Sequence, residues 1–300
     1  MPGTDAEGNP NTTFETANFT QNWEREAYLQ FWEADRINGF ESRVITQVHG
    51  FGSQSFNRKG LRMEFKGSEG ISNLNYPIFG DGIMESFDRF VVRASGQDAH
   101  RTSFRDAVAH SFFLDKDILA SRSRPVVVFI NGEYWGIHNI RERADERLAQ
   151  RVYQTDIEQM DCLEFSQAVM SARTGDTQRW NAIRDFVHQN DLDVPENYAA
   201  IAEMIDLDNF IEYYIAQIFV ANVGWANWNN RFWRHKPEQD LPGQYYDPDA
   251  MNPYRDGRFR WIFFDIDKGL GFQQSVTANT LQYAGSVGTW TTASSCSSAN

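Results

Sequence analysis

The chain has little cysteine, no long hydrophobic segment and an excess of negative charge. Its 300 residues include only two cysteines, Cys162 and Cys296, too few for a disulfide framework and spaced unlike the ligands of a zinc site. No apolar run approaches the ~18 residues of a membrane span. Residues 1–13 lack the apolar centre of a signal peptide. The formal net charge of −13 argues against a nucleic-acid partner.

The composition supports a folded domain with a large core. Hydrophobic residues make up 41% of the chain and aromatic residues 14%, enough for one large domain or two lobes. We expect an α+β fold, with a mainly antiparallel β region at residues 20–160 and a mainly helical region at residues 161–275. Residues 1–20 are expected to be a disordered polar terminus, and residues 276–300 a poorly packed polar tail.

Hydrophobic spacing predicts the elements within these regions. Alternating or β-branched segments predict strands at residues 19–33, 43–49, 61–66, 87–94, 125–130 and 134–140. The pair Asn131-Gly132 predicts a tight hairpin turn between the last two. Apolar residues at helical spacing predict helices at residues 103–112, 141–152, 171–190 and 206–220. The first of these helices should present Phe104, Val108 and Phe112 on one face.

A further short strand precedes two carboxylates. Residues 261–264 form a continuous apolar run that ends in a glycine-rich turn, which is typical of a buried strand. Asp265 and Asp267 stand two residues apart, so on a strand both side chains point to the same face. Two neighbouring carboxylates repel each other unless a cation lies between them. The pair is therefore either a Mg²⁺ or Ca²⁺ site or two solvated turn residues.

A second candidate site lies between two of the expected strands. Residues 50–55 form a glycine-containing loop. Backbone N–H groups in such a loop can face phosphates, although an ordinary hairpin loop has the same composition. Lys59 and Arg62 follow the loop and supply positive charge, with Arg62 on the polar face of its strand. By itself, Lys59 also fits a solvated loop lysine.

Several stretches, taken in order, resemble the CotH kinase family, which is named for a spore-coat protein. The matching stretches are Trp23-Glu24-Arg25 with Phe31-Trp32-Glu33, His49-Gly50 to Ser53 with Lys59-Gly60-Leu61-Arg62, Arg105-Asp106, Asn131-Gly132-Glu133-Tyr134-Trp135-Gly136 with Asn139-Ile140-Arg141-Glu142, Asn229-Asn230, and Asp265-Ile266-Asp267 with Gly271. Together they cover roughly residues 20–275. The resemblance implies a two-lobed, protein-kinase-like architecture and transfer of phosphate from ATP to Ser or Thr of a protein.

The resemblance also implies roles for individual residues. Lys59 and Arg62 would bind the ATP phosphates, and Glu142 would form an ion pair that positions the lysine. The implied metal is Mg²⁺, with Mn²⁺ or Ca²⁺ as alternatives. Its implied ligands are Asp265, Asp267, Asn229 and Asn230, and the implied catalytic residues are Asp265 and Asn222. The structural alternatives are a turn capped by its own asparagines and a glutamate at a helix start, with Arg105 and Asp106 as a structural pair.

The chain departs from the family pattern at three positions. Family members typically carry an aspartate, thought to be catalytic, where this chain has Gly224. Glycine cannot orient a hydroxyl or take a proton. Asn222 or Asn227 could orient the hydroxyl, although neither is a useful base. His49 replaces the usual arginine, and Gly60 the usual serine. We therefore expect weak or undetectable kinase activity, with metal-dependent nucleotide binding retained.

Three functions remain open from the sequence. The leading one is an ATP- and Mg²⁺-dependent protein kinase. The second is a pseudokinase-like binding or structural module of a surface or coat. The third is a secreted protein whose 9 Trp and 11 Tyr bind carbohydrate and whose aspartates bind Ca²⁺. The resemblance suggests a place outside the cell, at the cell surface or in a spore coat, and a fragment of a longer protein.

Overall fold

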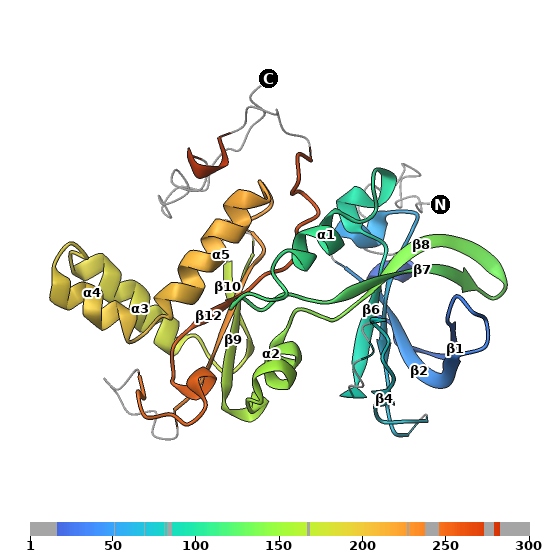
Figure 1. Ribbon diagram of the computed structural model, residues 1–300, viewed down its shortest axis with the longest axis horizontal. Helices are drawn as coiled ribbons and strands as arrows, with labels where there is room; N and C mark the ends of the chain where they lie inside the picture. Colours follow the sequence, from blue (N-terminus) through green and yellow to red (C-terminus); the bar gives the residue numbers. More distant parts are fainter. Residues whose placement is uncertain are drawn as a thin grey trace, which may run out of the picture. The chain divides into compact units, whose positions relative to one another are not determined.

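The computed structural model describes residues 17–50, 52–68, 70–80, 82, 86–166, 169–226, 228–237, 246–272 and 279–282. Expectations placed on residues 1–16, Asn227, Cys296 and most of the C-terminal tail lie outside these ranges. The chain forms two compact units, Met1–Ala107 with Arg122–Arg143, and Val108–Ser121 with Ala144–Asn300. Antiparallel sheets and separate helices confirm the α+β class (Figure 1).

The first unit is built on a curled antiparallel sheet of six strands, in the order β1-β2-β3-β6-β8-β7. These strands are β1 (Arg25–Trp32), β2 (Gly39–His49), β3 (Gly60–Glu64), β6 (Arg89–Arg93), β7 (Ser123–Ile130) and β8 (Glu133–Arg141). A two-stranded ladder pairs β4 (Leu74–Asn75) with β5 (Ser86–Phe87). Each strand that we expected before residue 141 is present. Helix α1 (Arg105–Ser111) runs from this unit into the second.

The two faces of this sheet differ in chemistry. One face is buried in the core of the unit and carries Val44, Met63, Phe90, Val92 and Ile140. Residues that pair across an antiparallel ladder share a face. The register accordingly places one row on the opposite face, formed by Gln47, Arg62, Val91 and Arg141. The sheet therefore has an apolar face and a polar face, and Arg62 lies on the polar one.

The expected turn between β7 and β8 is confirmed. Asn131 and Gly132 both have positive φ angles, 52° and 84°, as a type I′ hairpin turn requires. Asparagine and glycine enter this left-handed conformation more readily than other residues. The turn pairs Ile130 with Glu133, so the dipeptide sets the register of the hairpin.

The second unit contains a four-stranded sheet with helices beside it (Figure 1). The sheet has the order β10-β9-β11-β12, with β9 (Met160–Ser166), β10 (Val169–Thr174), β11 (Asn230–His235) and β12 (Arg260–Ile262). The helices are α2 (Glu146–Tyr153), α3 (Gln178–Gln189), α4 (Pro195–Ala202) and α5 (Leu207–Phe219). The single helix expected over residues 171–190 is wrong, because β10 occupies the first part. Gly175, at φ 68°, separates that strand from α3.

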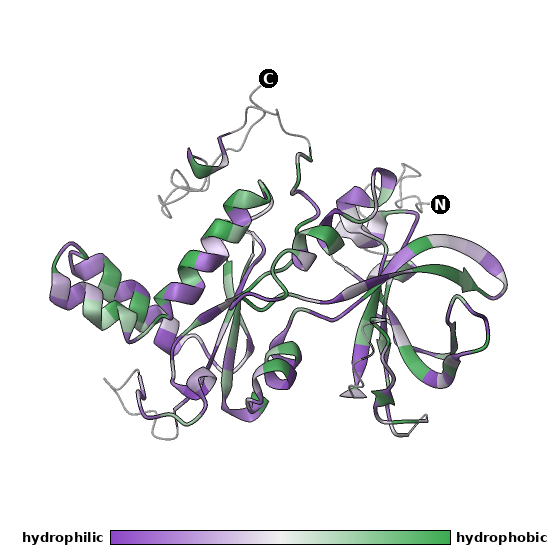
Figure 2. Cartoon of the chain, in the orientation of Figure 1, coloured by the Kyte–Doolittle hydropathy of each residue, from purple (hydrophilic) through white to green (hydrophobic). Residues whose placement is uncertain are grey.

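Helix α5 packs against the second sheet. Its N-terminus is capped by Asp206, whose carboxylate accepts a hydrogen bond from the backbone of Asn209. Tyr213 and Ala216 are buried in a core that includes Trp261 of β12. The C-terminal half of α5 is predominantly hydrophobic (Figure 2). No helix within the described ranges is long and apolar enough to cross a membrane.

The segment around α1 buries a different face from the one expected. Two of the three residues assigned to its apolar face, Phe104 and Phe112, are exposed, whereas Ala109 and Phe113 are buried. The reason is the length of the helix: α1 covers only Arg105–Ser111, so both exposed phenylalanines lie outside it. The apolar spacing in the sequence, from Phe104 to Phe112, extends beyond both ends of the helix.

Candidate functional site

Two of the polar segments singled out in the sequence leave the second sheet at the same edge. Strand β11 begins at Asn230, and β12 ends at Ile262. The two strands are antiparallel, with Arg231 opposite Ile262. The turn before β11 and the loop after β12 therefore meet at one edge of this sheet. That edge carries the Asn-Asn and Asp-x-Asp motifs.

Backbone and side-chain contacts hold these segments together beyond the sheet. The amide of Leu270 donates a 2.6 Å hydrogen bond to the carbonyl of Val220, just after α5. Gly224 lies against the side chain of Lys268. The end of α5, the asparagine-rich turn and the aspartate loop thus form one group of segments. The segments that carry the predicted residues of this unit meet there.

The two aspartates lie beyond the end of the strand rather than on it. Strand β12 ends at Ile262, and Asp265 has a left-handed backbone conformation with φ 59°. Asp265 and Asp267 therefore do not share a strand, and the expectation that a strand points both side chains to one face is wrong. Asp265 is partly exposed, and Asp267 is buried. Their convergence with the asparagine-rich turn rests on the loop contacts instead.

In both Asn222 and Asn230, the side-chain nitrogen donates a hydrogen bond and the side-chain oxygen accepts one. Asn222 donates to Gln217 Oε1 at 2.8 Å and accepts from the backbone N–H of Gly224 at 2.8 Å. Asn230 donates to the carbonyl of Ala226 at 2.6 Å and accepts from the hydroxyl of Tyr213 at 3.0 Å. Each carbonyl oxygen already has one partner. These contacts fit local turn stabilisation for both residues.

Asn229 differs from its two neighbours in the turn. Its side-chain nitrogen donates to the carbonyl of Gly224 at 3.0 Å. Its side-chain oxygen accepts no hydrogen bond from the described part of the chain. Among the amide oxygens of Asn222, Asn229 and Asn230, that of Asn229 is therefore the one left without a hydrogen-bond partner in the described part of the chain. Asn229 itself has φ 54°, a conformation that asparagine tolerates better than most residues.

The oxygen-bearing side chains of the aspartate loop and the asparagine-rich turn suit a metal ion that is only partly coordinated by protein. Groups of three or more His, Cys, Asp or Glu side chains placed to hold a metal do not occur among the described residues. Two carboxylates, Asp265 and Asp267, and the amide oxygen of Asn229 are the set present at the edge. Mg²⁺ typically binds one or two protein carboxylates and completes its shell with water and substrate phosphates. The donor set therefore fits Mg²⁺.

In the first unit, the amine of Lys59 is held by its own loop. It donates to the carbonyl of Gln54 at 2.7 Å and to the carbonyl of Phe56. It also lies over the ring of Phe19, 4.0 Å from the centroid. Burial lowers the pKa of this amine. Lys59 therefore stabilises the loop at residues 52–59, and a phosphate ligand would have to compete with the two carbonyls.

Arg62 lies on the polar face of the first sheet, as expected. Its guanidinium pairs with Glu24 at 3.2 Å and with Glu64 at 2.9 Å. Lys66 also pairs with Glu24 at 2.9 Å. Arg62 is thus part of a partly buried network of charges, in which an incoming anion would exchange with carboxylates.

Two more arginines lie on this face, and the sequence pattern alone assigned neither of them a role. Arg93 and Arg141 share the polar face with Arg62, because Arg62 pairs with Val91 and Val91 pairs with Arg141. Arg141 donates to the carboxylate of Asp106, and Arg93 lies 3.8 Å from the same carboxylate. In the sequence, Arg93 and Arg141 alternate with apolar residues, as expected for strands. This alternation places them on the same face as Arg62 only when the pairing of β3, β6 and β8 is known.

The ion pairs around Glu142 and the Arg-Asp dipeptide differ from expectation. Glu142 is buried and binds Arg122, with Oε1 2.7 Å from a guanidinium nitrogen. The expected ion pair between Glu142 and Lys59 is therefore wrong, because each group is engaged elsewhere. Arg105 binds Asp98, while its neighbour Asp106 binds Arg141, so the dipeptide residues serve two separate structural pairs.

His49 stands where the family pattern has arginine, and its surroundings are strongly positive. Burial, together with the positive charges of Arg143 and Arg93, lowers the pKa of His49 to about 3. The imidazole is therefore neutral at physiological pH. Arg62 and Arg141 also act on this group. This end of the polar face is rich in guanidinium groups.

Comparison with protein-family models identifies a family. A family model described as CotH kinase protein matches residues 46–295. A search of curated proteins finds no match. The matched range includes the polar face of the first sheet and the aspartate loop of the second unit, so all the residues assigned above fall within it.

Proposed function

Because the chain belongs to the CotH kinase protein family, we propose that it binds ATP with a divalent metal ion and transfers phosphate to Ser or Thr of a protein. In this proposal the two compact units correspond to the lobes of a kinase-like layout. The six-stranded sheet is the β lobe, and the unit with α2–α5 is the helical lobe. The nucleotide and its metal are the ligands, and the protein acceptor is the substrate.

The observation that carries this proposal is the meeting of the Asn-Asn turn and the Asp-x-Asp loop at one edge of the second sheet. Arg231 of β11 pairs with Ile262 of β12, and Leu270 bonds to Val220. These contacts bring together two segments whose side chains carry carboxylate and amide oxygens, the donors that Mg²⁺ prefers. Separate surface turns would not need such contacts.

Each group has a role that follows from its chemistry. The carboxylates of Asp265 and Asp267, with the amide of Asn229, would hold the metal, which neutralises charge on the phosphates. Arg62 would bind phosphate oxygens, and Lys59 would either join it or keep the loop in shape. The buried pair of Glu142 and Arg122 would support the β lobe without contacting the nucleotide.

A second candidate function is a binding module with little or no turnover. The observation that favours it is Gly224, which stands where the family pattern has a catalytic aspartate. Asn222 cannot act as a base, and both ends of its amide are engaged. Phosphoryl transfer depends mainly on positioning and charge neutralisation, so loss of the aspartate would slow the reaction more than it would weaken ATP binding.

The experiment that separates the two candidates is a transfer assay. The protein is incubated with Mg²⁺ and γ-labelled ATP in the presence of a Ser- and Thr-rich acceptor such as casein. Slow transfer that disappears in Asp265→Asn would support the kinase. Metal-dependent ATP binding without transfer would support the binding module. Absence of ATP binding in the folded protein would contradict both.

A further inference from the structure

The exposed side of α5 carries an apolar stripe that the site described above does not use. Ile211, Ile215 and Phe219 recur every four residues, so they lie on one side of the helix. They are 50%, 58% and 67% exposed. Their exposure contrasts with that of Tyr213 and Ala216, which face the core. A stripe of large apolar residues in water is a typical feature of a binding surface.

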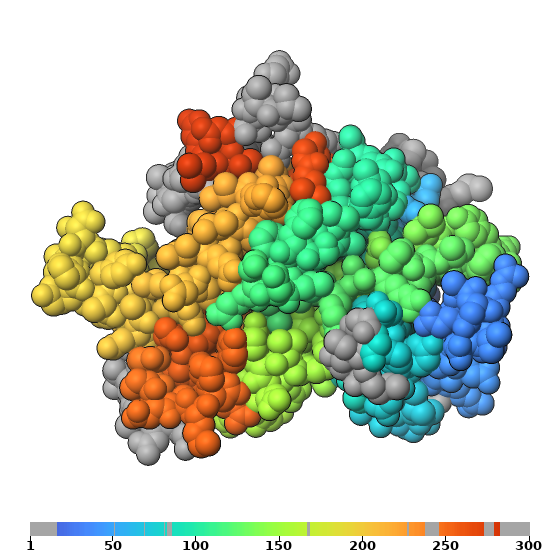
Figure 3. All heavy atoms as spheres, viewed as in Figure 1, coloured from blue at the N-terminus to red at the C-terminus, as the bar shows by residue number. Residues whose placement is uncertain are grey.

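A second segment of the same unit forms the other wall of a groove. Residues 112–117 lie beside α5 (Figure 3). The ring of Phe219 contacts those of Phe112 and Phe113, with centroids 6.0 Å and 6.3 Å apart. The backbone N–H of Asp117 donates to Glu212 at 2.9 Å. These contacts place residues 112–117 along α5, with a groove between this segment and the helix.

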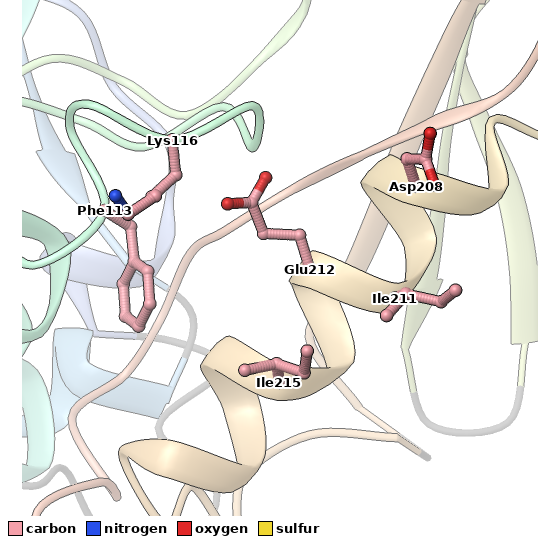
Figure 4. A pocket seen from close by; sticks show the side chains of 6 residues that line it. All are labelled: Phe113, Lys116, Asp208, Ile211, Glu212 and Ile215. Atoms are coloured by element: carbon pink, nitrogen blue, oxygen red, sulfur yellow. The ribbon is translucent and has the colours of Figure 1, made fainter.

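The groove has an apolar floor and an acidic border. It is lined by Phe113, Lys116, Asp208, Ile211, Glu212 and Ile215 (Figure 4). Lys116 is already paired with Asp115 at 3.1 Å. The carboxylates of Asp208 and Glu212, one helical turn apart, therefore leave the border negative. The side chain of Asp208 makes no hydrogen bond or ion pair with the described part of the chain.

From this chemistry we propose that the groove beside α5 binds an amphipathic helix of a partner protein. The helix would place apolar side chains at i, i+3 or i+4, and i+7 on Ile211 and Ile215. It would place Lys or Arg beside Asp208 and Glu212. This is the helix-in-groove mode of recognition, and the charges on the border set the orientation of the bound helix.

A second copy of this chain fits the groove less well. If α5 packed antiparallel against its own copy, Asp208 at its N-terminal end would face the apolar C-terminal end of the other helix. This carboxylate would then be buried without a positive partner on that helix, which costs free energy. A helix with basic residues satisfies the same border. The negative charge of Asp208 and Glu212 therefore favours a basic partner helix over a second copy of this chain.

The first test is a selection from a displayed library of helical peptides. The library varies the residues of an 18-residue helix, and the probe is the full chain. We expect enrichment of peptides with apolar residues at helical spacing next to Lys or Arg. A selection without enrichment would overturn the proposal. So would enriched peptides that are acidic or lack apolar spacing.

The second test uses matched variants with the best selected peptide, measured by fluorescence anisotropy. Ile211→Ser with Ile215→Ser should weaken binding about tenfold or more. The control is Val187→Ser with Tyr198→Ser, which removes apolar residues of similar exposure from α3 and α4 and should leave affinity unchanged. Circular dichroism verifies that both variants fold.

The salt dependence of peptide binding and the self-association of the chain are measured as well. Binding should weaken as salt is raised, because the border charges are exposed. Equal affinity of the two double variants would assign the peptide to another surface and overturn the proposal. Concentration-dependent self-association that is lost only in the Ile211→Ser, Ile215→Ser variant would assign the groove to a second copy instead.

Discussion

Gly224 lies directly against the side chain of Lys268. A β-carbon placed on Gly224 would be 3.2 Å from Lys268 Cδ and 3.2 Å from Asn222 Oδ1. Because Lys268 follows Asp267, this position borders the loop that carries the proposed metal ligands. The φ angle of Gly224 lies outside the left-handed region, so a side chain is compatible with the backbone. The lysine stem is flexible and can give way.

Gly224→Asp should therefore raise the rate of phosphate transfer and leave ATP affinity nearly unchanged. General-base help is typically worth ~10²–10⁴-fold, and labelled-phosphate transfer to a protein acceptor measures the gain. Gly224→Ala is the control, because it adds the β-carbon without the carboxylate and should give no gain. Full activity in the parent, with none gained in Gly224→Asp, would show that another residue fills this role.

Arg62→Ala should raise the dissociation constant of ATP. Loss of one charged hydrogen bond typically costs ~1.5–3 kcal/mol, or about ten- to hundredfold. Lys59→Ala should raise it as well, in part because the loop loses the bonds to Gln54 and Phe56. Arg43→Ala, an exposed arginine in the neighbouring strand β2, is the control. Changes below twofold in both phosphate-site variants would reject the assignment.

Glu142→Gln should destabilise the protein without weakening ATP binding. The carboxylate is buried and binds Arg122, and removal of one partner of a buried ion pair typically costs about 3 kcal/mol or more. Urea unfolding measures the loss. Asp185→Asn breaks an exposed ion pair with Arg184 and should cost less than about 1 kcal/mol. A large drop in ATP affinity in folded Glu142→Gln would return this residue to the nucleotide site.

Stability should fall as pH is lowered below about 6.5, in part because of His49. Burial, with Arg143 and Arg93, lowers the pKa of His49 from 6.5 to about 3 in the folded protein. Between these values the unfolded chain binds more protons, so the unfolding free energy decreases with falling pH. The slope is at most about 1.4 kcal/mol per pH unit. Urea unfolding at pH 7.5 and pH 5 measures it.

The matched variant for this prediction is His49→Gln, which removes the titrating group. Its unfolding free energy should change less between the two pH values than that of the parent. If the parent and His49→Gln lose equal stability, the low pKa of His49 does not contribute, and carboxylate pairs carry the acid sensitivity.

Local sequence patterns were sufficient for most of the first unit. Alternation identified β1, β2, β3, β6, β7 and β8, and Asn131-Gly132 identified their hairpin turn, because each signal is confined to a few residues. The second unit was harder to predict. Strand β10 lies in a segment of mixed helix and strand preference, and β9 pairs with β11 about 70 residues away. Such non-local pairing has no local signature.

In the candidate site, too, local motifs were predictable from the sequence, whereas contacts between distant residues were not. The residue types of the Asn-Asn and Asp-x-Asp motifs indicated their chemistry, and the pairing of β11 with β12 then placed them together. The partners of individual groups were not predictable. Glu142 binds Arg122 rather than Lys59, and Asn222 and Asn230 are engaged by Gln217 and Tyr213. These partners depend on tertiary packing that spacing does not encode.

Calorimetric titration with ATP most directly tests the proposed metal-dependent nucleotide site at the edge of the second sheet. The titration is done with Mg²⁺ and with a chelator, for the parent and for Asp265→Asn. Asparagine tolerates the left-handed backbone at this position, so the variant should fold. We predict that the parent binds ATP only with Mg²⁺ and that Asp265→Asn binds at least about tenfold more weakly. Equal affinity in the folded variant, or ATP binding that ignores Mg²⁺, would contradict the account.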